Sequence, residues 1–492
     1  MKSPGDFEPR TRMYLLCAFA ALLMFSRLGD GRLANFDDCY YAEKAKEMLQ
    51  AGDWLTPHFA GNVRLDNPPL FLWIVAGGFR VFGVSGYGAS FFSALAGVLC
   101  IPLLMRIARR LGFDAFGALC AGVVLLTTQY FLKYAQHAMM DVILTLFFLL
   151  ALDGYLTGEE GRRRGFVQLG VATGLGILMK SVLGLFPLVV VAVHRLVFRR
   201  ARALTDPGLW LAGAIALAVS APWFLFQLFH HHDQFLEEHV RWLLFRRGLI
   251  EPGYDGFAHD MFGYPLRIAS VYWPWLPFAL AGIWFACGRA FDRSAEKEAR
   301  SSASLVLLWL TVVIGIMSLG HVKKLWYVMS VFPCLALLSS VAIDRMLKST
   351  AARERAAHWA MAVLAVFAGV VALTPFGPAR PRQPDLQAMT SIVRANVPAG
   401  QKVLNLDAPY WELANQFLFY SDHDLTEPLT DPALVREGVR RGGWALIAAA
   451  RVPEVLGDDA ATISVVARSG VWALLAAAPA APLNVPPIDA SP

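Results

Sequence analysis

NFDDCYYAEKAKEMLQAGDWLTPHFAGNVRLDNPPL, residues 35–70, is a polar stretch in a chain that is otherwise strongly apolar. Its first part predicts an amphipathic helix over 39–50, because apolar residues recur from Tyr41 at helical spacing while charged residues occupy the other side. The acids Asp37 and Asp38 precede this helix, where capping and the helix dipole favour negative charge. A cap needs only one side chain, so capping alone explains one acid. We expect a helix lying flat on a membrane surface, with two carboxylates at its leading end.

The composition identifies the class of protein. Of 492 residues, 56% are hydrophobic and 17% are charged, whereas soluble domains average roughly a quarter charged residues. Long segments almost free of charge predict an all-α polytopic membrane protein. The net charge of +6 does not indicate nucleic acid, because the basic residues cluster in short loops between apolar segments. Most cysteines fall inside those segments, so we expect no disulfide framework, and only Cys39 to meet water.

The positions of the basic residues predict a topology. The N-terminal tail carries Lys2, Arg10 and Arg12 and is placed in the cytoplasm, with 13–28 as a retained anchor. If 70–83 is a re-entrant or interfacial piece, every later basic loop also lies in the cytoplasm. About eleven transmembrane helices result. They are 13–28, 87–105, 116–131, 142–156, 166–179, 182–198, 209–229, 266–287, 305–319, 325–343 and 358–375.

After Pro375 the composition changes. Short apolar runs alternate with helical patterns, which predicts a small α/β extramembrane domain over 376–492, outside by span parity and ending in a loose Ala/Pro-rich tail. The expected strands are 402–406, 444–449, 463–468 and 471–476, and 386–396 is an expected helix. Residues 1–375 then form a transmembrane domain, whose outer loop, 30–86, contains interfacial helices.

On this topology, ionisable residues gather at the outer membrane face and avoid mid-span positions. Asp141 and Lys180 are examples, at the ends of predicted spans. A proton- or ion-coupled transporter places charges near the bilayer midplane, often with an internal repeat. The sequence shows neither feature, which favours a reaction centre at the outer leaflet.

Several motifs together resemble a known family. FDDCYYAEKAKEML and AGDWLTPHFAGNVRLDNPPLFLW are similar to the first outer loop of the GT-C polyprenyl-phosphate-sugar glycosyltransferases. That class includes the aminoarabinose transferase of lipid A and the protein O-mannosyltransferases. HAMMDVILTLFF, LMKSVLGLFP, FLEEHVRW and SLGHVKKLWYVMSVFP follow in the right order. The similarity covers roughly residues 10–345, and it implies that residues 1–375 are the catalytic domain.

The resemblance implies an inverting transfer of a sugar from a polyprenyl-phosphate carrier to an acceptor. The acceptor is lipid A or another surface glycan, a lipid, or a protein, at the periplasmic face of a multi-pass protein of the bacterial inner membrane. Asp37 is the implied base that takes the acceptor's proton, supported by Asp141. Lys180 is the implied contact of the donor phosphate. Further phosphate contacts are implied at Asn67, Arg241, Lys324 and Tyr327.

Structural roles compete with these assignments. Asp141 is also placed to cap the helix that begins at Val142. Lys180 lies at a span end, where a lysine snorkels toward the interface. The other outer-loop cations are equally suited to contact lipid headgroups.

One position departs from the family pattern. Members usually carry lysine before the Pro-Pro, where this chain has Asn67, and asparagine brings no charge. Either Lys180, Arg64 or a metal then carries more of the phosphate binding, or the donor differs. Asp66 matches a family acid implicated with His239 in divalent-metal binding, so the expected cofactor is zinc or magnesium on a two-ligand site.

Two other functions are compatible with a membrane protein of this kind. A flippase of polyprenyl-linked glycans needs no base at one face, so Asp37→Ala would leave its transport largely intact. A membrane scaffold would lose its function on deletion of 376–492, while substitutions in the first loop stayed silent.

Overall fold

The computed structural model describes residues 4–26, 28, 33, 36–199, 205–242, 262–320, 322–374, 384–408, 410–457 and 461–478. The chain divides into two compact units. The helical unit comprises Met1–Leu28, Asp53–Pro57 and Arg64–Pro378, and the sheet unit comprises Gly29–Gly52, His58–Val63 and Ala379–Pro492. Part of the first polar loop therefore folds together with the C-terminal residues. The predicted Ala/Pro-rich tail lies largely outside the described residues.

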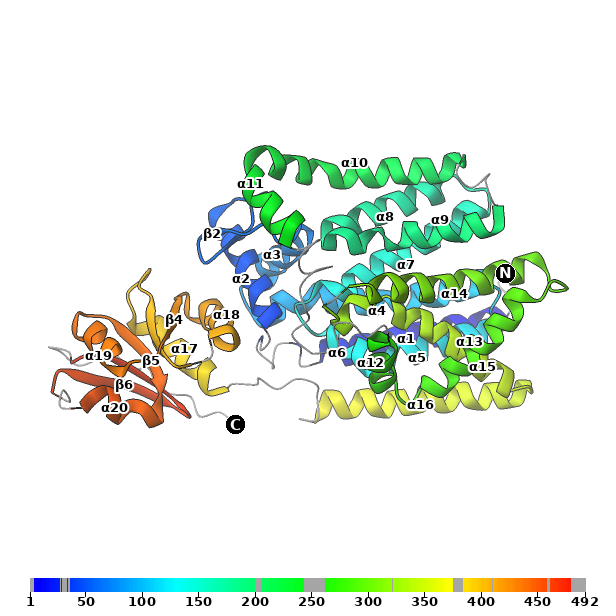
Figure 1. The fold of residues 1–492 in the computed structure, drawn as a ribbon. Coiled ribbons are helices and arrows are strands. Elements are labelled where there is room, and N and C mark those ends of the chain that lie inside the picture. The colour runs from blue at the N-terminus through cyan, green and yellow to red at the C-terminus, as the bar shows by residue number, and fades with distance from the viewer. Residues whose placement is uncertain are drawn as a thin grey trace. The chain divides into compact units, whose positions relative to one another are not determined.

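The helical unit is built almost entirely from α-helices (Figure 1). Its first half contains α1 (Pro4–Phe25), α3 (Leu70–Phe82), α4 (Gly86–Arg110), α5 (Ala115–Leu126), α6 (Gln129–Ala135), α7 (Met140–Glu159) and α8 (Arg164–Lys180). Next come η1 (Ser181–Leu185), α9 (Phe186–Arg199), α10 (Pro207–His230) and α11 (His232–Phe235). The last part contains α12 (Gly263–Val271), α13 (Leu276–Phe291), α14 (Lys297–Ser318), η4 (Leu325–Val328), α15 (Val331–Met346) and α16 (Thr350–Leu373).

Six of the described helical segments are long and apolar enough to cross a membrane, and the bent pair α5–α6 makes a seventh. One of the six, Arg164–Phe198, reverses direction at Ser181. Arg195 in α9 lies only 4.9 Å from the ring of Phe166 in α8, whereas a straight helix would separate them by about 43 Å. The predicted all-α polytopic class is confirmed, and the count of eleven spans stays a prediction.

Two predicted segments differ in detail from the observed helices. The predicted span 266–287 is two helices, because α12 ends at Val271 and α13 begins at Leu276, and Pro274 between them has no N–H to continue a helix. The segment expected to be re-entrant or interfacial is α3, whose 13 residues extend about 20 Å, less than the hydrocarbon core.

The two ends of α7 carry different chemistry. Asp141 lies in its first turn. At the other end, Asp153 accepts a hydrogen bond of 2.9 Å from Arg106 Nε, and Arg195 pairs with Glu159. Because the basic loops begin at this second end, we name it the basic end of the helical unit. It is the end that the sequence predicts to be cytoplasmic.

The C-terminal part of the sheet unit is a five-stranded mixed sheet in the order β4-β3-β5-β7-β6. The strands are β3 (Val403–Leu406), β4 (Leu425–Leu429), β5 (Trp444–Ala448), β6 (Ile463–Ser469) and β7 (Trp472–Ala477). The first three are parallel and the last two antiparallel. The helices are α17 (Pro384–Asn396), α18 (Tyr410–Ser421), α19 (Pro432–Arg440) and α20 (Val452–Leu456), with a short η5 (Ala449–Arg451). The predicted α/β region is confirmed.

Alternating side chains place one helix pair on each face of this sheet. Leu446 of β5 packs in a core with Met389 of α17 and Phe417 of α18. Its neighbour Ile447 packs in a second core with Val439 of α19. This follows from the two-residue period of a strand, and it explains why the strand sequences are nearly continuous in hydrophobicity.

The helix predicted in the first loop, α2 (Phe36–Ala51), packs against α18 within the sheet unit, beside the hairpin of β1 (His58–Phe59) and β2 (Asn62–Val63). Its existence is confirmed, but the predicted solvent-facing polar side is wrong. Glu43 and Lys46 are 3% and 4% exposed. The prediction failed because the covering helix lies far along the chain.

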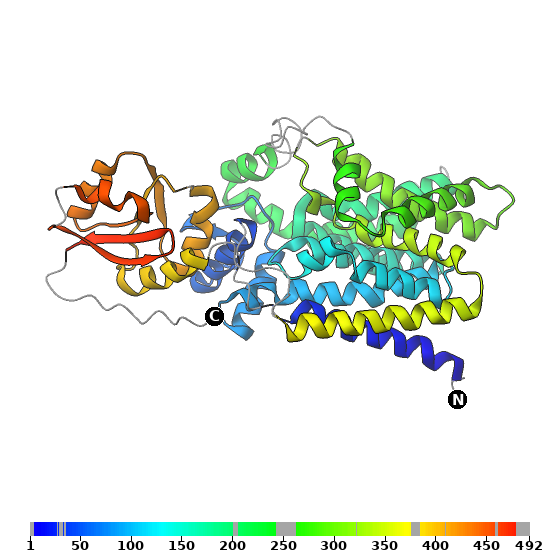
Figure 2. The same cartoon turned by 90° about the horizontal axis from the view of Figure 1, so that it is seen from below.

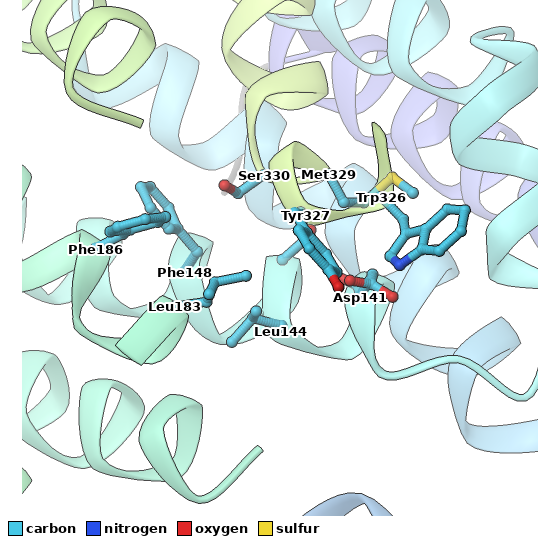
Figure 3. A pocket seen from close by; sticks show the side chains of 10 residues that line it. Asp141, Leu144, Phe148, Leu183, Phe186, Trp326, Tyr327, Met329 and Ser330 are labelled. Carbon is cyan, nitrogen blue, oxygen red and sulfur yellow. The ribbon is translucent and has the colours of Figure 1, made fainter. Parts of the chain in front are cut away.

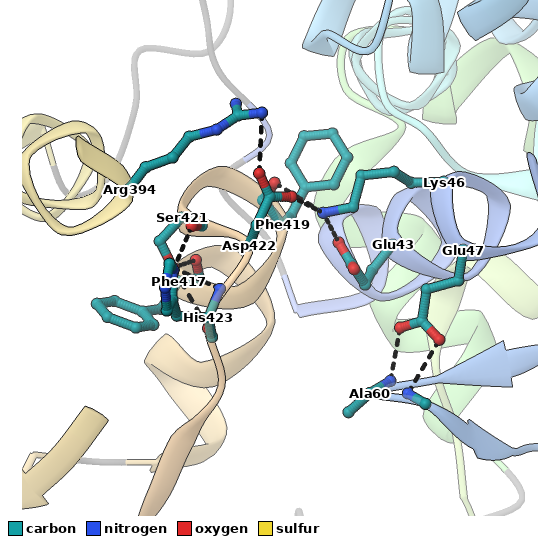
Figure 4. Close-up of polar contacts among 11 residues, drawn as sticks. Glu43, Lys46, Glu47, Ala60, Arg394, Phe417, Phe419, Ser421, Asp422 and His423 are labelled. Atoms are coloured by element: carbon teal, nitrogen blue, oxygen red, sulfur yellow. Dashed lines mark hydrogen bonds and ion pairs between the residues drawn. The ribbon is translucent and has the colours of Figure 1, made fainter. Parts of the chain in front are cut away.

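The buried charges of α2 satisfy one another and α18 (Figure 4). Lys46 Nζ lies 2.6 Å from a Glu43 carboxylate oxygen, and it donates hydrogen bonds to Asp422 Oδ1 at 2.9 Å and to the Phe419 carbonyl at 3.2 Å. Cys39 is also fully buried, and its thiol donates to the Leu33 carbonyl. The prediction that Cys39 meets water is therefore wrong.

Burial raises the pKa of Glu43 from an ordinary 4.5 to about 7, against the opposing effect of Lys46. Between these two values the native state binds a proton that the unfolded state has released. The stability of the sheet unit should therefore fall as the pH rises from 4.5 to 7, by on the order of 3 kcal/mol. Hydrogen exchange of residues 36–51 in the full-length protein, corrected for the intrinsic rate, should show stronger protection at pH 5 than at pH 8. Glu43→Gln should remove this dependence, whereas a control Glu47→Gln should keep it.

Candidate active site

A pocket lies beside the first turn of α7, within the helical unit (Figure 3). Its polar lining residues are Asp141, Thr145, Trp326, Tyr327 and Ser330. Its apolar lining residues are Leu144, Phe148, Leu183, Phe186 and Met329. The pocket thus has a polar side and an apolar side, and the apolar side is suited to hydrocarbon.

Asp141 and Lys180 form a close ion pair at this pocket. Lys180 Nζ lies 2.5 Å from Asp141 Oδ1 and 4.7 Å from the centre of the Tyr327 ring. The side chains of Asp141 and Lys180 are 1% and 13% exposed. The N-cap residue of α7 is Met139, and Lys180 is directed at a carboxylate. Capping by Asp141 and snorkelling by Lys180 therefore do not describe these side chains.

The second oxygen of Asp141 has a separate significance. Asp141 Oδ2 is buried and has no hydrogen-bond partner among the residues that the structure describes. A buried polar atom without a partner is uncommon in native proteins. Because Asp141 lines the pocket, a hydroxyl or amine of a bound ligand would be one source of the missing donor.

A tight turn places Lys180 beside Asp141, although Lys180 is not itself among the residues that line the pocket. α8 ends at Lys180, and Ser181 has φ +48° and ψ −125°, a conformation that side chains with a Cβ rarely adopt. Its hydroxyl lies 3.1 Å from His239 Nε2, while His239 Nδ1 lies 3.0 Å from the Leu65 carbonyl. His239 therefore connects the turn after Lys180 to the loop that carries Asp66 and Asn67.

The turn after Lys180 also requires glycine at position 184. A Cβ built on Gly184 would lie 2.1 Å from the backbone of Gly176 and Ile177, whose atoms cannot move cheaply. Gly184→Ala should therefore separate η1 from α8, move Lys180 and lower both the unfolding temperature and the activity. Gly315→Ala, where a Cβ meets nothing within 4 Å, is the control and should leave both unchanged. Thermal unfolding in detergent measures the effect, and equal behaviour of the two variants would contradict it.

The two predicted metal ligands do not form a ready metal site in this arrangement. His239 is 1% exposed and both its ring nitrogens face protein oxygens. Asp66 Oδ2 accepts a hydrogen bond of 2.8 Å from the Asn67 amide. Over the described residues, no group of three or more His, Cys, Asp or Glu side chains is placed to hold an ion. The divalent metal stays a prediction.

Of the other predicted phosphate contacts, only Tyr327 is among the residues that line the pocket, and Asn67, Arg241 and Lys324 are not. Tyr327 lines the pocket, and Lys324 lies beside it, with Nζ 5.8 Å from the centre of the Trp326 ring. Arg241 is exposed, pairs with Glu237 one turn earlier and does not line the pocket. Sequence reasoning did not single out Trp326, although the adjacent Trp and Tyr after two lysines were a usable signal.

Asp37 belongs to the sheet unit, where it lies in the first turn of α2 and is partly exposed. Its neighbour Asp38 is 1% exposed. The acid that the resemblance assigns as base is thus the more accessible one. Its role as base stays a prediction.

Residues 11–236 match the family described as dolichyl-phosphate-mannose-protein mannosyltransferase. The undecaprenyl phosphate-alpha-4-amino-4-deoxy-L-arabinose arabinosyl transferase 2 of Pseudomonas fluorescens is 29% identical over 346 residues, which are 68% of this chain and 56% of that protein. The transferase of Pseudomonas aeruginosa with the same description, without the numeral, is 29% identical over 352 residues, 69% of this chain and 60% of that protein. This chain thus spans less than two thirds of the length of these two transferases.

Solved structures share the fold. The crystal structure of ArnT from Cupriavidus metallidurans bound to undecaprenyl phosphate has a TM-score of 0.74 at 19% identity, covering 94% of this chain and 97% of that chain. This chain therefore shares the fold of that protein over almost its whole length. The archaeal oligosaccharyltransferase AglB from Archaeoglobus fulgidus, in complex with an inhibitory peptide and a dolichol-phosphate, is more distant, with a TM-score of 0.55 at 11% identity over 91% of this chain and 70% of that chain.

Proposed function

We propose that the protein transfers a sugar, with inversion, from a polyprenyl-phosphate carrier to an acceptor at the periplasmic face of the bacterial inner membrane. The observation that supports this most is the pocket that Asp141 and Tyr327 line together with apolar residues, next to Lys180, which pairs with Asp141. A lipid-phosphate sugar has the same sequence of parts, because a polar sugar is joined through a phosphate to a hydrocarbon chain.

Lys180 binds the phosphate in this proposal. An ammonium group has three donors, and Asp141 Oδ1 accepts only one of them. The others are directed to phosphate oxygens, and the Tyr327 hydroxyl adds a neutral donor. Leu183 and Phe186, on the apolar side of the pocket, then contact the first isoprene units of the carrier. Asp141 Oδ2 accepts a hydrogen bond from the sugar.

Asp37 is the base that removes the proton from the acceptor hydroxyl. The acceptor oxygen attacks the anomeric carbon on the face opposite to the phosphate, and the bond from that carbon to the phosphate oxygen breaks. The electron pair of the broken bond stays on the polyprenyl phosphate, where Lys180 stabilises the added charge. The acceptor is lipid A or another surface glycan, a lipid, or a protein hydroxyl.

The orientation rests on the distribution of charge. Asp141 and the basic end lie at opposite ends of α7. Because basic loops are retained in the cytoplasm, the Asp141 pocket faces the periplasm.

Mass spectrometry of surface lipids and glycoproteins from cells with and without the protein tests this function. A transferase predicts that one surface molecule loses the mass of a sugar residue while the lipid-linked sugar accumulates. The same loss should appear in cells that carry Lys180→Met. A flippase predicts instead that lipid-linked sugar is retained in the inner leaflet and that purified protein catalyses no transfer. That result would overturn the proposal.

A further inference from the structure

A second cavity lies in the helical unit, away from the Asp141 pocket, and shares no lining residue with it. It has a volume of about 300 Å³ and lies among α5, α13, α15 and α16. Its lining includes Phe116, Val123, Trp275, Phe278, Met346 and Ala356, and no lining residue carries a charge. The cavity is therefore suited to hydrocarbon.

Small residues on α16 leave this space open. Ala356, Ala357 and Ala360 line the cavity at positions where larger side chains would fill it. α16 packs on α1 and α5 and lies beside α1 (Figure 2). Its outer side is exposed, as Val366 at 68% shows. A chain entering the cavity from the surrounding bilayer therefore meets α16 at the edge of the helical unit.

The cavity begins at the basic end and extends only part of the way into the membrane. Met346 and Leu347 mark the end of α15 there. Along α5 the lining runs from Phe116 to Val124, and the lining residue Trp275 donates a hydrogen bond to Thr127, just after α5. The rise from residue 116 to residue 127 is about 16 Å, roughly half of the ~30 Å hydrocarbon core. This length matches a single acyl chain from one leaflet better than the much longer chain of a polyprenyl carrier.

Positive charge lies beside the part of the cavity lining that the end of α15 contributes. Arg345 and Lys348 flank Met346 and Leu347 and are exposed. The nearby carboxylates are already engaged, because Arg353 lies 2.9 Å from an oxygen of Asp114 and 2.9 Å from one of Asp344.

Within the described part of the chain, neither Arg345 nor Lys348 forms an ion pair. The Arg345 guanidinium lies 4.3 Å from the centre of the Phe285 ring, which holds it at the edge of the unit. A phosphate is the group that two such cations bind well.

We infer that this cavity binds one acyl chain of an anionic phospholipid from the leaflet at the basic end, with the lipid phosphate at Arg345 and Lys348. The chain fills the space between α5 and α16, and the headgroup lies beside the end of α15. The site is separate from donor binding and does not rest on the proposed function. It predicts that α16 is held to the rest of the unit partly by a lipid.

Native mass spectrometry of the full-length protein, with dioleoyl phosphatidylglycerol and dioleoyl phosphatidylcholine at equal concentration, tests the inference. The protein should retain one phosphatidylglycerol at least about fivefold over phosphatidylcholine. Arg345→Glu with Lys348→Glu, both at exposed positions, should reduce that ratio to about one. Ala360→Trp should fill the cavity and reduce retention of both lipids about fivefold, whereas Val366→Trp on the exposed side of α16 should change nothing.

Three outcomes would overturn the inference. Equal retention of the two lipids by the unmodified protein would show that no headgroup is selected. An unchanged ratio in the double glutamate variant would place the phosphate elsewhere, and this variant decides the question even if Ala360→Trp does not fold. Displacement of phosphatidylglycerol by undecaprenyl phosphate, one for one, would assign the cavity to the carrier.

Discussion

A Lys180→Met variant is expected to fold less stably and to lose transfer by roughly 10²–10³-fold. The substitution leaves Asp141, 1% exposed, as a carboxylate without its cation, and breaking a buried pair in this way costs about 3–5 kcal/mol. It also removes the charge that holds the donor phosphate. Thermal unfolding and the yield of the surface product identified by mass spectrometry measure the two effects separately.

A double variant distinguishes the loss of stability from the loss of sugar transfer. Lys180→Met combined with Asp141→Asn leaves no uncompensated charge, so most of the lost stability should return while transfer stays low. Lys133→Met is the matched control. Lys133 is exposed in α6, and its recorded contact is with the Tyr134 ring at 5.8 Å, so its loss should change stability by less than about 0.5 kcal/mol. A double variant that transfers sugar at the unmodified rate would exclude Lys180 as the phosphate contact.

Asp37→Asn is expected to abolish transfer while the protein stays folded in the membrane. The amide keeps the size of the side chain but cannot take a proton, and loss of a general base typically reduces a rate by about 10²–10⁴-fold. Asp37 is partly exposed in the first turn of α2, so the fold should tolerate the change. Transfer in membranes, normalised to the amount of protein, is the measurement.

Asp38→Asn controls for the effect of the substitution on the helix. Both variants remove one negative charge from the first turn of α2, where the helix dipole favours negative charge. Only Asp37→Asn should also abolish sugar transfer. If Asp37→Asn transferred sugar at a near-normal rate, or if Asp38→Asn were equally inactive per folded molecule, the assignment of the base would fail.

The sequence predicts those parts of the fold that depend on local pattern. The apolar run Trp444–Ala449 is β5, and the helical pattern 386–396 is α17, because period and hydrophobicity specify strands and helices within a few residues. The break at Pro274 was less visible, since an apolar segment of normal span length conceals two short helices. Hydropathy averages over such breaks, so the number of spans is the weakest part of this prediction.

The sequence predicts which residues belong to the candidate site, but not the distances between their side chains. Span topology brings Asp141 and Lys180 to one end of the helices, and it places them near each other. The distance of 2.5 Å between Lys180 Nζ and Asp141 Oδ1 depends on the backbone of Ser181, with φ +48°, and on the close approach of Gly184 to α8. No periodicity encodes these features. The wrong prediction for the polar side of α2 has a different cause, because its partner Asp422 is distant in the chain.

The long separation along the chain between α2 and its partner Asp422 has a consequence for synthesis of the protein. Lys46 and Asp422 are separated by 376 residues, which a ribosome adds in about 20 to 75 s at ~5–20 residues per second. During that interval the nascent chain carries α2 without the helix that will cover it, and its lysine and glutamate stay hydrated. The chain therefore completes this packing only after residue 422 has been translated, and a product that terminates before Asp422 would expose α2 to proteases of the quality-control system.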